Sequence, residues 1–398
     1  MPTEMSEQIQ PHRIHDWLCV ARLRRTKRWP SLWVCSILHG FVRKVVHDAM
    51  KLLRLRLVDL GPFTDVTVSF RGPDDAPRSM TVVFGGAGVG KTTLLSAIAT
   101  TRPGHAVASV TPGSGPRGFA VADWDLGDDD PDRPHPLRVA SPNASLDEET
   151  EDERLRRREQ GLFDRRAVDQ GGFVVLCQTA QRWYSRSPVT LSAPSRTVLR
   201  YDVRAPAHFD DASHSDLARE TKQTLLFSSV GSRLTEAETG RPVTSFGVLD
   251  EALRDMLRRL LDLARFRYVG IDPTTLEPMF ATDQGDVVAF DRLPTSIRHL
   301  VGFAVLTVRG LFAAYPGRDP RMTEGLVLID EVALHQETAV QRGLVPALRG
   351  ALPRVQWLLT TSSADVTTGC EPHEVLALRR MPATRSVELF EGPLATLH

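Results

Sequence analysis

A glycine-rich stretch at residues 85–92, GGAGVGKT, constrains the fold of this chain more than any other feature. It follows an apolar run at residues 80–84, which predicts a β-strand, and precedes residues 93–99, which predict a helix. Glycines permit backbone angles that side chains forbid, and they let the chain approach a ligand closely. The N–H groups of such a turn and of the following helix attract anions. This order predicts a phosphate-binding loop (P-loop) rather than a simple glycine-rich connection.

The P-loop motif predicts roles for two of its side chains and a set of nucleotide-binding residues. Lys91 supplies a mobile positive charge for the β- and γ-phosphates of a nucleotide, and the Thr92 hydroxyl is placed to bind Mg²⁺. The predicted nucleotide-binding residues are Gly85, Gly86, Ala87, Gly88, Val89, Gly90, Lys91, Thr92 and Thr93.

A second signal lies at residues 325–331, GLVLIDE. Its apolar residues predict a buried parallel strand, and an acidic pair stands at the carboxyl end, where open α/β sheets bind ligands. Asp330 is predicted to hold Mg²⁺, and Glu331 to orient or deprotonate the water that attacks the γ-phosphate. An acidic strand end alone is weak evidence. After an upstream P-loop it indicates the Walker B motif.

Length and composition exclude little. The 398 residues suffice for one large domain or two, and the net charge of zero gives no global signature of nucleic-acid binding, although a local basic patch stays open. Cys19, Cys35, Cys177 and Cys370 form no CxxC pair, which predicts neither a zinc site nor a disulfide framework and fits a reducing cytoplasm. No apolar run reaches the length of a membrane span. We therefore expect a cytoplasmic protein.

Residues 1–49 are not expected to belong to the main fold. They are rich in Arg, His and Trp, which is typical of a basic aromatic arm that touches nucleic acid or an acidic surface. We favour the alternative of an N-terminal extension, which is either an appended helix or a disordered or non-native segment translated from a start codon set too early, because Met50 begins a segment typical of a domain start.

Residues 50–398 predict one domain with a long insertion at about 101–270. Strands are expected at 51–60 and 64–70, before the P-loop strand. Within the insertion, the sequence predicts an antiparallel meander at 118–126 and 136–140, followed by a charged segment at 147–158. It then predicts strands at 173–178 and 197–203, and helices within 213–265. After it we expect a hairpin of 266–271 with 287–290, a helix to about 314, a strand at 355–359, and a terminal hairpin of 375–379 with 386–390.

Taken in this order, the sequence resembles the ABC-type ATPases of the SMC, RecF and OLD group, often labelled AAA-type ATP-binding proteins. The P-loop, LPTSIR at 293–298, DEVALH at 330–335 and TTSS at 360–363 carry the resemblance, which covers about residues 50–398. It implies an α/β fold, a P-loop NTPase with a mostly parallel core sheet flanked by helices. An antiparallel β subdomain and a helical insertion would complete it.

The resemblance also implies how ATP would be used. Residues 293–298 match the signature motif, which contacts the γ-phosphate bound to the opposite subunit, so that ATP joins two heads. Ser296 replaces the usual glycine of that motif, and Ser362 replaces the histidine of the switch loop. Gln178 is a candidate for the glutamine loop, although a solvent-facing glutamine is an equal alternative. These departures favour ATP binding over fast turnover.

The leading hypothesis is therefore a Mg²⁺-dependent ATPase that forms a homodimer through ATP and couples this cycle to a partner protein or to DNA. One alternative is an ATP-sensing switch with little turnover, which the two serines favour. A transporter ATPase subunit is disfavoured, because the chain has antiparallel strands and a charged insertion instead of a compact helical insert and a glycine-rich signature. A small-molecule kinase is disfavoured because the basic residues at 154–158 lie beside acidic ones, unlike a lid. The sequence leaves the process and the partner open.

Overall fold

The computed structural model describes residues 50–103, 114–127, 130, 132–141, 144, 150–156, 174–189, 216–240, 245–315, 317–384 and 386–396. The predictions for residues 1–49 and for a strand at 197–203 lie outside these ranges. So does part of the charged segment, of which α2 (Glu151–Arg156) is described.

A mostly parallel sheet forms the centre of the fold. Its strands are β3 (Met80–Phe84), β6 (Val175–Gln178), β10 (Gly325–Ile329), β11 (Val355–Thr361), β12 (Val375–Arg380) and β13 (Val387–Glu391). They lie in the order β13-β12-β3-β11-β10-β6, and only β13 runs antiparallel to its neighbour. The predicted core sheet and terminal hairpin are confirmed.

A separate antiparallel sheet has the order β2-β1-β4-β5. Its strands are β1 (Lys51–Leu60), β2 (Phe63–Ser69), β4 (Ser114–Asp125) and β5 (Leu137–Ala140). Because β4 pairs with β1 over most of its length, the predicted meander continues the N-terminal hairpin in one sheet. This sheet is the antiparallel subdomain expected from the resemblance.

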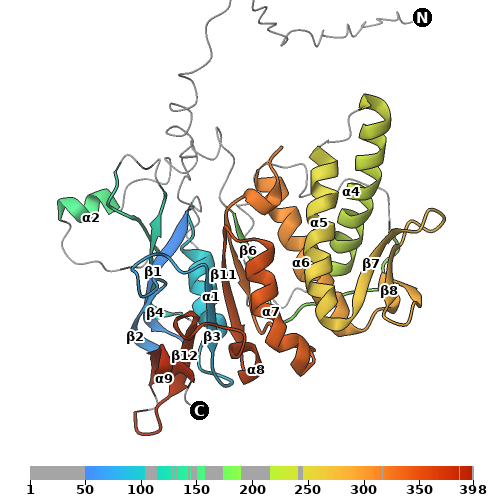
Figure 1. Ribbon diagram of the computed structural model, residues 1–398. Coiled ribbons are helices and arrows are strands. Elements are labelled where there is room, and N and C mark those ends of the chain that lie inside the picture. The colour runs from blue at the N-terminus through green and yellow to red at the C-terminus, as the bar shows by residue number, and fades with distance from the viewer. Residues whose placement is uncertain are drawn as a thin grey trace, which may run out of the picture. The chain divides into compact units, whose positions relative to one another are not determined.

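Helices cover both faces of the core sheet (Figure 1). The α-helices are α1 (Lys91–Thr100), α4 (Leu217–Thr239), α5 (Ser245–Leu261), α6 (Thr295–Ala314), α7 (Thr338–Ala351), α8 (Ala364–Thr367) and α9 (Pro393–Thr396). Short 3₁₀ turns are η2 (Asp262–Ala264), η3 (Phe290–Arg292), η4 (Pro320–Met322) and η5 (Pro372–Glu374). The helices predicted within 213–265 and up to residue 314 are confirmed.

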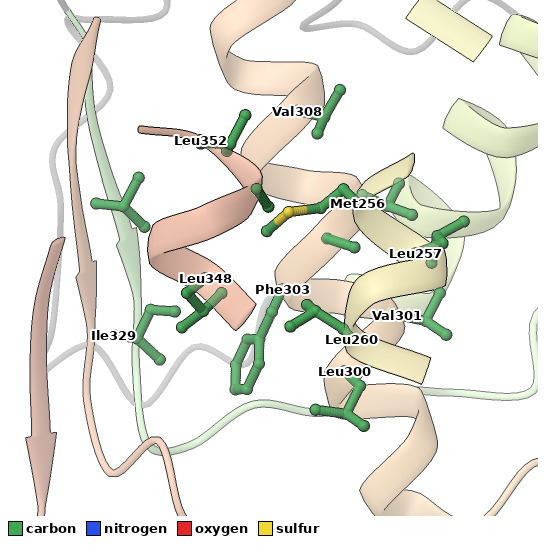
Figure 2. Packing of buried hydrophobic residues seen from close by; sticks show 14 of the residues in the cluster. Met256, Leu257, Leu260, Leu300, Val301, Phe303, Val308, Ile329, Leu348 and Leu352 are labelled. Carbon is green, nitrogen blue, oxygen red and sulfur yellow. The ribbon is translucent and has the colours of Figure 1, made fainter. Parts of the chain in front are cut away.

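Strand β10 shows how the sequence builds two cores. Leu326 and Leu328 face a cluster that contains α1 and the antiparallel sheet, whereas Val327 and Ile329 face a cluster that contains α5, α6 and α7. Figure 2 shows Ile329 in the second cluster with apolar residues of α5 and α6. Because both faces of the strand are buried, its sequence is continuously apolar rather than alternating.

Helix α6 is the central helix of the second cluster. It is the one helix of the described residues that is long and apolar enough to cross a membrane, and 89% of its most apolar window is buried inside the domain. A core helix has the same composition, because every side of it meets other apolar residues.

The predicted pairing of 266–271 with 287–290 is wrong. β7 (Phe266–Ile271) pairs with β8 (Pro278–Thr282), and β8 in turn pairs with β9 (Val287–Ala289). The Asp272 carboxylate accepts the N–H groups of Thr274 and Thr275, so the turn after β7 is tight and the chain returns at once. Pro278 stands at the first strand position, where a missing N–H donor is tolerated.

Candidate nucleotide-binding site

The P-loop connects β3 with α1 and needs glycine for two different reasons. Gly88 and Gly90 have φ angles of 72° and 95°, which side chains disfavour. A Cβ atom on Gly90 would also lie 2.7 Å from ring atoms of Phe63, and one on Gly85 would lie 2.7 Å from the carbonyl oxygen of Leu378. The loop is therefore held tightly between β2 and β12, which fixes its N–H groups in space.

Lys91 lies folded back over the P-loop. Its Nζ donates to the carbonyl oxygens of Gly85 at 2.7 Å and Gly86 at 2.8 Å, and it forms an ion pair with Glu331 Oε1 at 3.0 Å. The residue is only 6% exposed. All three partners are oxygen atoms, so a phosphate oxygen could replace any of them without leaving the ammonium group unpaired.

Asp330 lies directly after β10 and is 2% exposed. Its Oδ2 accepts the Thr92 hydroxyl at 2.8 Å, and its Oδ1 accepts the Thr360 hydroxyl at 2.5 Å. The residue that follows the P-loop lysine and the acidic end of β10 are therefore in contact, as the two sequence motifs predict. Thr360, at the end of β11, is a contact that the motifs did not specify.

Glu331 occupies an unusual backbone conformation, with a φ of 45°. Its N–H donates to the Thr360 hydroxyl at 2.8 Å. Its carboxylate pairs with Lys91 and accepts the N–H and the hydroxyl of Ser362, both at 3.2 Å. Ser362 thus lies beside the carboxylate of Glu331, at the position where the resembling family has its switch-loop histidine.

Gln178 is the last residue of β6, and β6 pairs with β10 so that Gln178 is opposite Ile329. Its carbonyl oxygen accepts the Asp330 N–H at 2.9 Å. The side chain is buried, and neither amide atom has a hydrogen-bond partner among the described residues. The solvent-facing alternative is wrong, because this amide is buried next to Asp330 and lacks partners that a ligand could supply.

The predicted signature residue Ser296 lies apart from this cluster, in the first turn of α6. Its carbonyl oxygen accepts the Gln336 side-chain N–H at 3.1 Å. Thr93, also predicted, lies in the first turn of α1, and its hydroxyl faces Gly61 in the turn between β1 and β2. The structure therefore brings together the P-loop, Gln178, Asp330, Glu331 and Ser362, and leaves Ser296 outside.

Arg182 was not predicted by any motif. Its guanidinium donates to the carbonyl oxygens of Thr179, Asp330 and Glu331, and it lies 5.0 Å above the centre of the Phe303 ring. Burial lowers the pKa of Arg182 to about 10, while the charges of Asp330 and Glu331 oppose this shift. Only the folded chain brings this arginine to the end of β10, so no local pattern could have revealed it.

The residues fit a magnesium nucleotide. Mg²⁺ in such sites takes one or two protein ligands, with water and phosphate oxygens supplying the others. Thr92 and Asp330 are already in contact, and Gln178, whose backbone carbonyl bonds to Asp330, has a buried amide without a described partner. Within the described residues no group of three or more His, Cys, Asp or Glu side chains could hold a metal ion by itself. The donor set therefore suits an ion that arrives with a phosphate.

Comparisons with known proteins agree with this site. Residues 50–104 match a family model described as an AAA domain. The Septu protein PtuA of Bacillus thuringiensis is 24% identical over 160 residues, which cover 39% of this chain and only 37% of that protein.

Two of the solved structures that are similar to this chain are SMC head domains, at low sequence identity. The SMC head domain from Thermotoga maritima is 11% identical with a TM-score of 0.41, covering 86% of this chain and 98% of that chain. An Smc head domain with an extended coiled coil, bound to the C-terminal domain of ScpA from Pyrococcus furiosus, is 12% identical with a TM-score of 0.47, covering 86% and 96%. The AAA-domain match and the contact between the two Walker motifs together confirm the resemblance to P-loop ATPases.

Proposed function

We propose that this protein binds Mg²⁺-ATP at the P-loop and hydrolyses it, and that ATP joins two copies of the chain. The observation that carries the proposal is the convergence of Lys91, Thr92, Asp330 and Glu331 at one edge of the core sheet, where the Gln178 carbonyl oxygen also bonds to Asp330. These are the groups that phosphoryl transfer requires for phosphate binding, metal binding and orientation of water.

Each residue has a distinct proposed role in binding or hydrolysis. The P-loop N–H groups and Lys91 bind the β- and γ-phosphates, while Thr92, Asp330 and Gln178 hold the metal ion. When bound, Mg²⁺ neutralises charge on the phosphate oxygens. Lys91 exchanges Glu331 for a phosphate oxygen, and the released carboxylate accepts a proton from the attacking water. Ser362 stays beside the carboxylate and orients it.

Dimerisation rests on the first turn of α6. Thr295 is exposed and Ser296 partly so, and the helix N-terminus carries partial positive charge that suits a phosphate bound to another copy. With Ser296 in place of glycine, backbone approach to that phosphate is restricted. We therefore propose an ATP-dependent dimer that forms with modest affinity and turns over slowly.

Two variants test this proposal. Lys91→Ala should lose ATP binding, because the phosphates lose their cation. Glu331→Gln should keep ATP bound but hydrolyse it poorly, and should accumulate at twice the monomer mass in light scattering with Mg²⁺-ATP. Arg258→Ala, an exposed position on α5, is the control. Unchanged ATP affinity in Lys91→Ala, or a Glu331→Gln protein that stays monomeric with ATP bound, would contradict the proposal.

We further propose that the protein is cytoplasmic and couples the cycle to a partner protein or to DNA. The resemblance supports this coupling, and the net charge of zero gives no separate support for DNA. Hydrolysis measured with and without duplex DNA, at two salt concentrations, separates the two partners. Stimulation that weakens with salt would indicate DNA, because phosphate contacts release counterions.

The second candidate function is an ATP-sensing switch with little turnover. It is favoured by the Glu331 carboxylate, which both Lys91 and Ser362 engage. Tight ATP binding with a hydrolysis rate equal to that of Glu331→Gln would identify the switch.

A further inference from the structure

We propose that Arg182 is a positioning residue, which holds the backbone of Glu331 in the conformation that aims its carboxylate at the attacking water. This inference rests on the proposed role of Glu331 in hydrolysis. It adds a residue outside the nucleotide-binding motifs to the machinery of the site.

The Arg182 guanidinium binds the backbone on both sides of the Glu331 Cα. Arg182 Nη1 donates to the Asp330 carbonyl oxygen at 2.6 Å, and Nη2 donates to the Glu331 carbonyl oxygen at 2.8 Å. One planar fork thus binds two consecutive carbonyl groups. The side chain is nine-tenths buried, and no carboxylate oxygen of the described residues lies within ion-pair distance of it. A buried guanidinium whose donors bind backbone carbonyl groups holds that backbone in position.

The backbone conformation of Glu331 is one that needs to be held. The φ of 45° at Glu331 is left-handed, which costs a residue with a side chain about 1–2 kcal/mol. Such a conformation persists only where neighbouring groups fix it. Thr360 accepts the Glu331 N–H, and Arg182 binds the carbonyl groups before and after this residue's Cα. Together they restrain both peptide groups that flank Glu331.

Arg182 lies in the segment that follows β6 and contacts neighbouring elements of the site. It lies four residues beyond Gln178, in the segment that leaves β6, and its Nη1 also binds the Thr179 carbonyl oxygen at 2.8 Å. Its guanidinium stacks on Phe303 of α6 at 5.0 Å. The residue therefore links the segment after Gln178, the end of β10 and helix α6. A ligand that draws on Gln178 also acts on the segment that fixes Glu331.

The fork explains why arginine is required. A lysine at this position keeps the charge, but its three donors rotate about one nitrogen on a flexible stem and lack the fixed planar fork of the guanidinium. Without the fork, the Glu331 backbone relaxes and its carboxylate moves. A displacement of 1 Å at a reacting group costs about 100-fold in rate.

The variant Arg182→Lys tests the inference, with Arg309→Lys as the matched control. Arg309 is also a buried arginine, on α6, but it pairs with Glu220 away from the site. We expect Arg182→Lys to lower kcat roughly 10- to 100-fold while the Kd for a fluorescent ATP analogue changes by less than about twofold. Arg309→Lys should leave both values unchanged. If lysine prevents folding, Arg182→Gln keeps one donor group without the buried charge and should give the same split.

A double-mutant cycle with Glu331→Gln shows whether Arg182 acts through Glu331. If it does, Arg182→Lys should cause no further loss of hydrolysis in the Glu331→Gln background. Additive losses, an unchanged kcat, or a loss confined to ATP affinity would each overturn the inference.

Amide hydrogen exchange separates this inference from the proposed function. The N–H groups of Glu331 and Val332 donate to Thr360 and should exchange faster in Arg182→Lys than in Arg309→Lys. Should the wild-type protein hydrolyse ATP no faster than Glu331→Gln, the proposed function fails, and exchange alone decides whether Arg182 holds this backbone. Equal exchange in the two variants would overturn the inference.

Discussion

Lys91 and Glu331 lie 3.0 Å apart, so the cation that we propose for phosphate binding and the carboxylate that we propose for orienting water neutralise each other. Asp330 is likewise engaged by the hydroxyls of Thr92 and Thr360. At the scale of single residues, the site is thus a set of satisfied partners that a phosphate and a metal ion rearrange. Ser362, which bonds to Glu331, and Gln178, whose amide has no described partner, make that rearrangement testable.

Ser362 should contribute to hydrolysis through Glu331. Ser362→Ala removes one hydrogen bond to the carboxylate, which is worth about 1 kcal/mol, or roughly a fivefold loss in kcat. Ser363→Ala is the matched control, because the Ser363 hydroxyl bonds to Gln341 on α7 instead. Ser362→His restores the side chain of the resembling family and should raise kcat. Steady-state ATP hydrolysis measures all three, and an equal loss in both alanine variants would argue against a specific role for Ser362.

Gln178 should stabilise the protein only when a ligand is bound. Its amide atoms are buried without described partners, so Gln178→Leu should raise the free energy of unfolding without nucleotide by about 1–3 kcal/mol. It should also weaken Mg²⁺-ATP binding, and the rise in Tm on adding Mg²⁺-ATP should shrink. Gln356→Leu is the control, because the Gln356 amide is buried with Leu52 and Arg78 as partners and its loss should destabilise. Opposite signs for the two leucine variants in thermal unfolding are the expected result, and equal signs would contradict it.

At the scale of elements, buried contacts fix the helices α6 and α4. Sixteen residues of α6 are buried, and two of its glycines meet neighbouring side chains closely. The arm formed by α4 is tied to the β7-β8-β9 sheet by Lys222, which is fully buried between Glu277 and Asp291.

The packing of α6 predicts a steric effect at Gly302. A Cβ atom there would lie 2.0 Å from the Tyr184 hydroxyl, so Gly302→Ala should lower the free energy of unfolding by about 1–3 kcal/mol. Gly350→Ala in α7 should instead stabilise by about 0.5–1 kcal/mol, because the nearest neighbour would be 3.6 Å away. Urea unfolding compares the two. Tyr184→Phe should recover part of the loss in Gly302→Ala, and no recovery would place the strain elsewhere.

The buried ion cluster predicts a large effect at Lys222. Lys222→Met leaves two carboxylates without their cation and should lower the free energy of unfolding by about 3–5 kcal/mol. Arg342→Met removes an exposed pair with Asp365 and should cost less than about 1 kcal/mol. A loss below 1 kcal/mol in Lys222→Met would show that the cluster does not hold α4 in place.

At the scale of the whole molecule, the order of the parallel strands assembles the site. The carboxyl ends of β3, β6, β10 and β11 meet at one sheet edge, and each contributes a side chain there or leads into one. The sequence predicted the P-loop and the acidic pair because each is a local pattern with a local physical cause. Gly90 needs its backbone angle, and Asp330 ends a strand that is apolar on both faces.

Other contacts depend on which strands become neighbours. Thr360 bonds to both Asp330 and Glu331 only because β11 lies between β3 and β10. Arg182 stands in a turn without any motif, and only the pairing of β6 with β10 brings it to Glu331. β8 was missed because it is short and begins with Pro278, so its pattern resembled the turns around it.

The hydrolysis rate of the wild-type protein relative to Glu331→Gln, measured at saturating Mg²⁺-ATP, tests the central claim most directly. Binding of a fluorescent ATP analogue, measured on the same samples, controls for loss of the site. We expect both proteins to bind the analogue equally and Glu331→Gln to hydrolyse ATP at least roughly 100-fold more slowly, because it lacks the carboxylate that accepts the proton. Equal hydrolysis rates, with equal binding, would contradict the account.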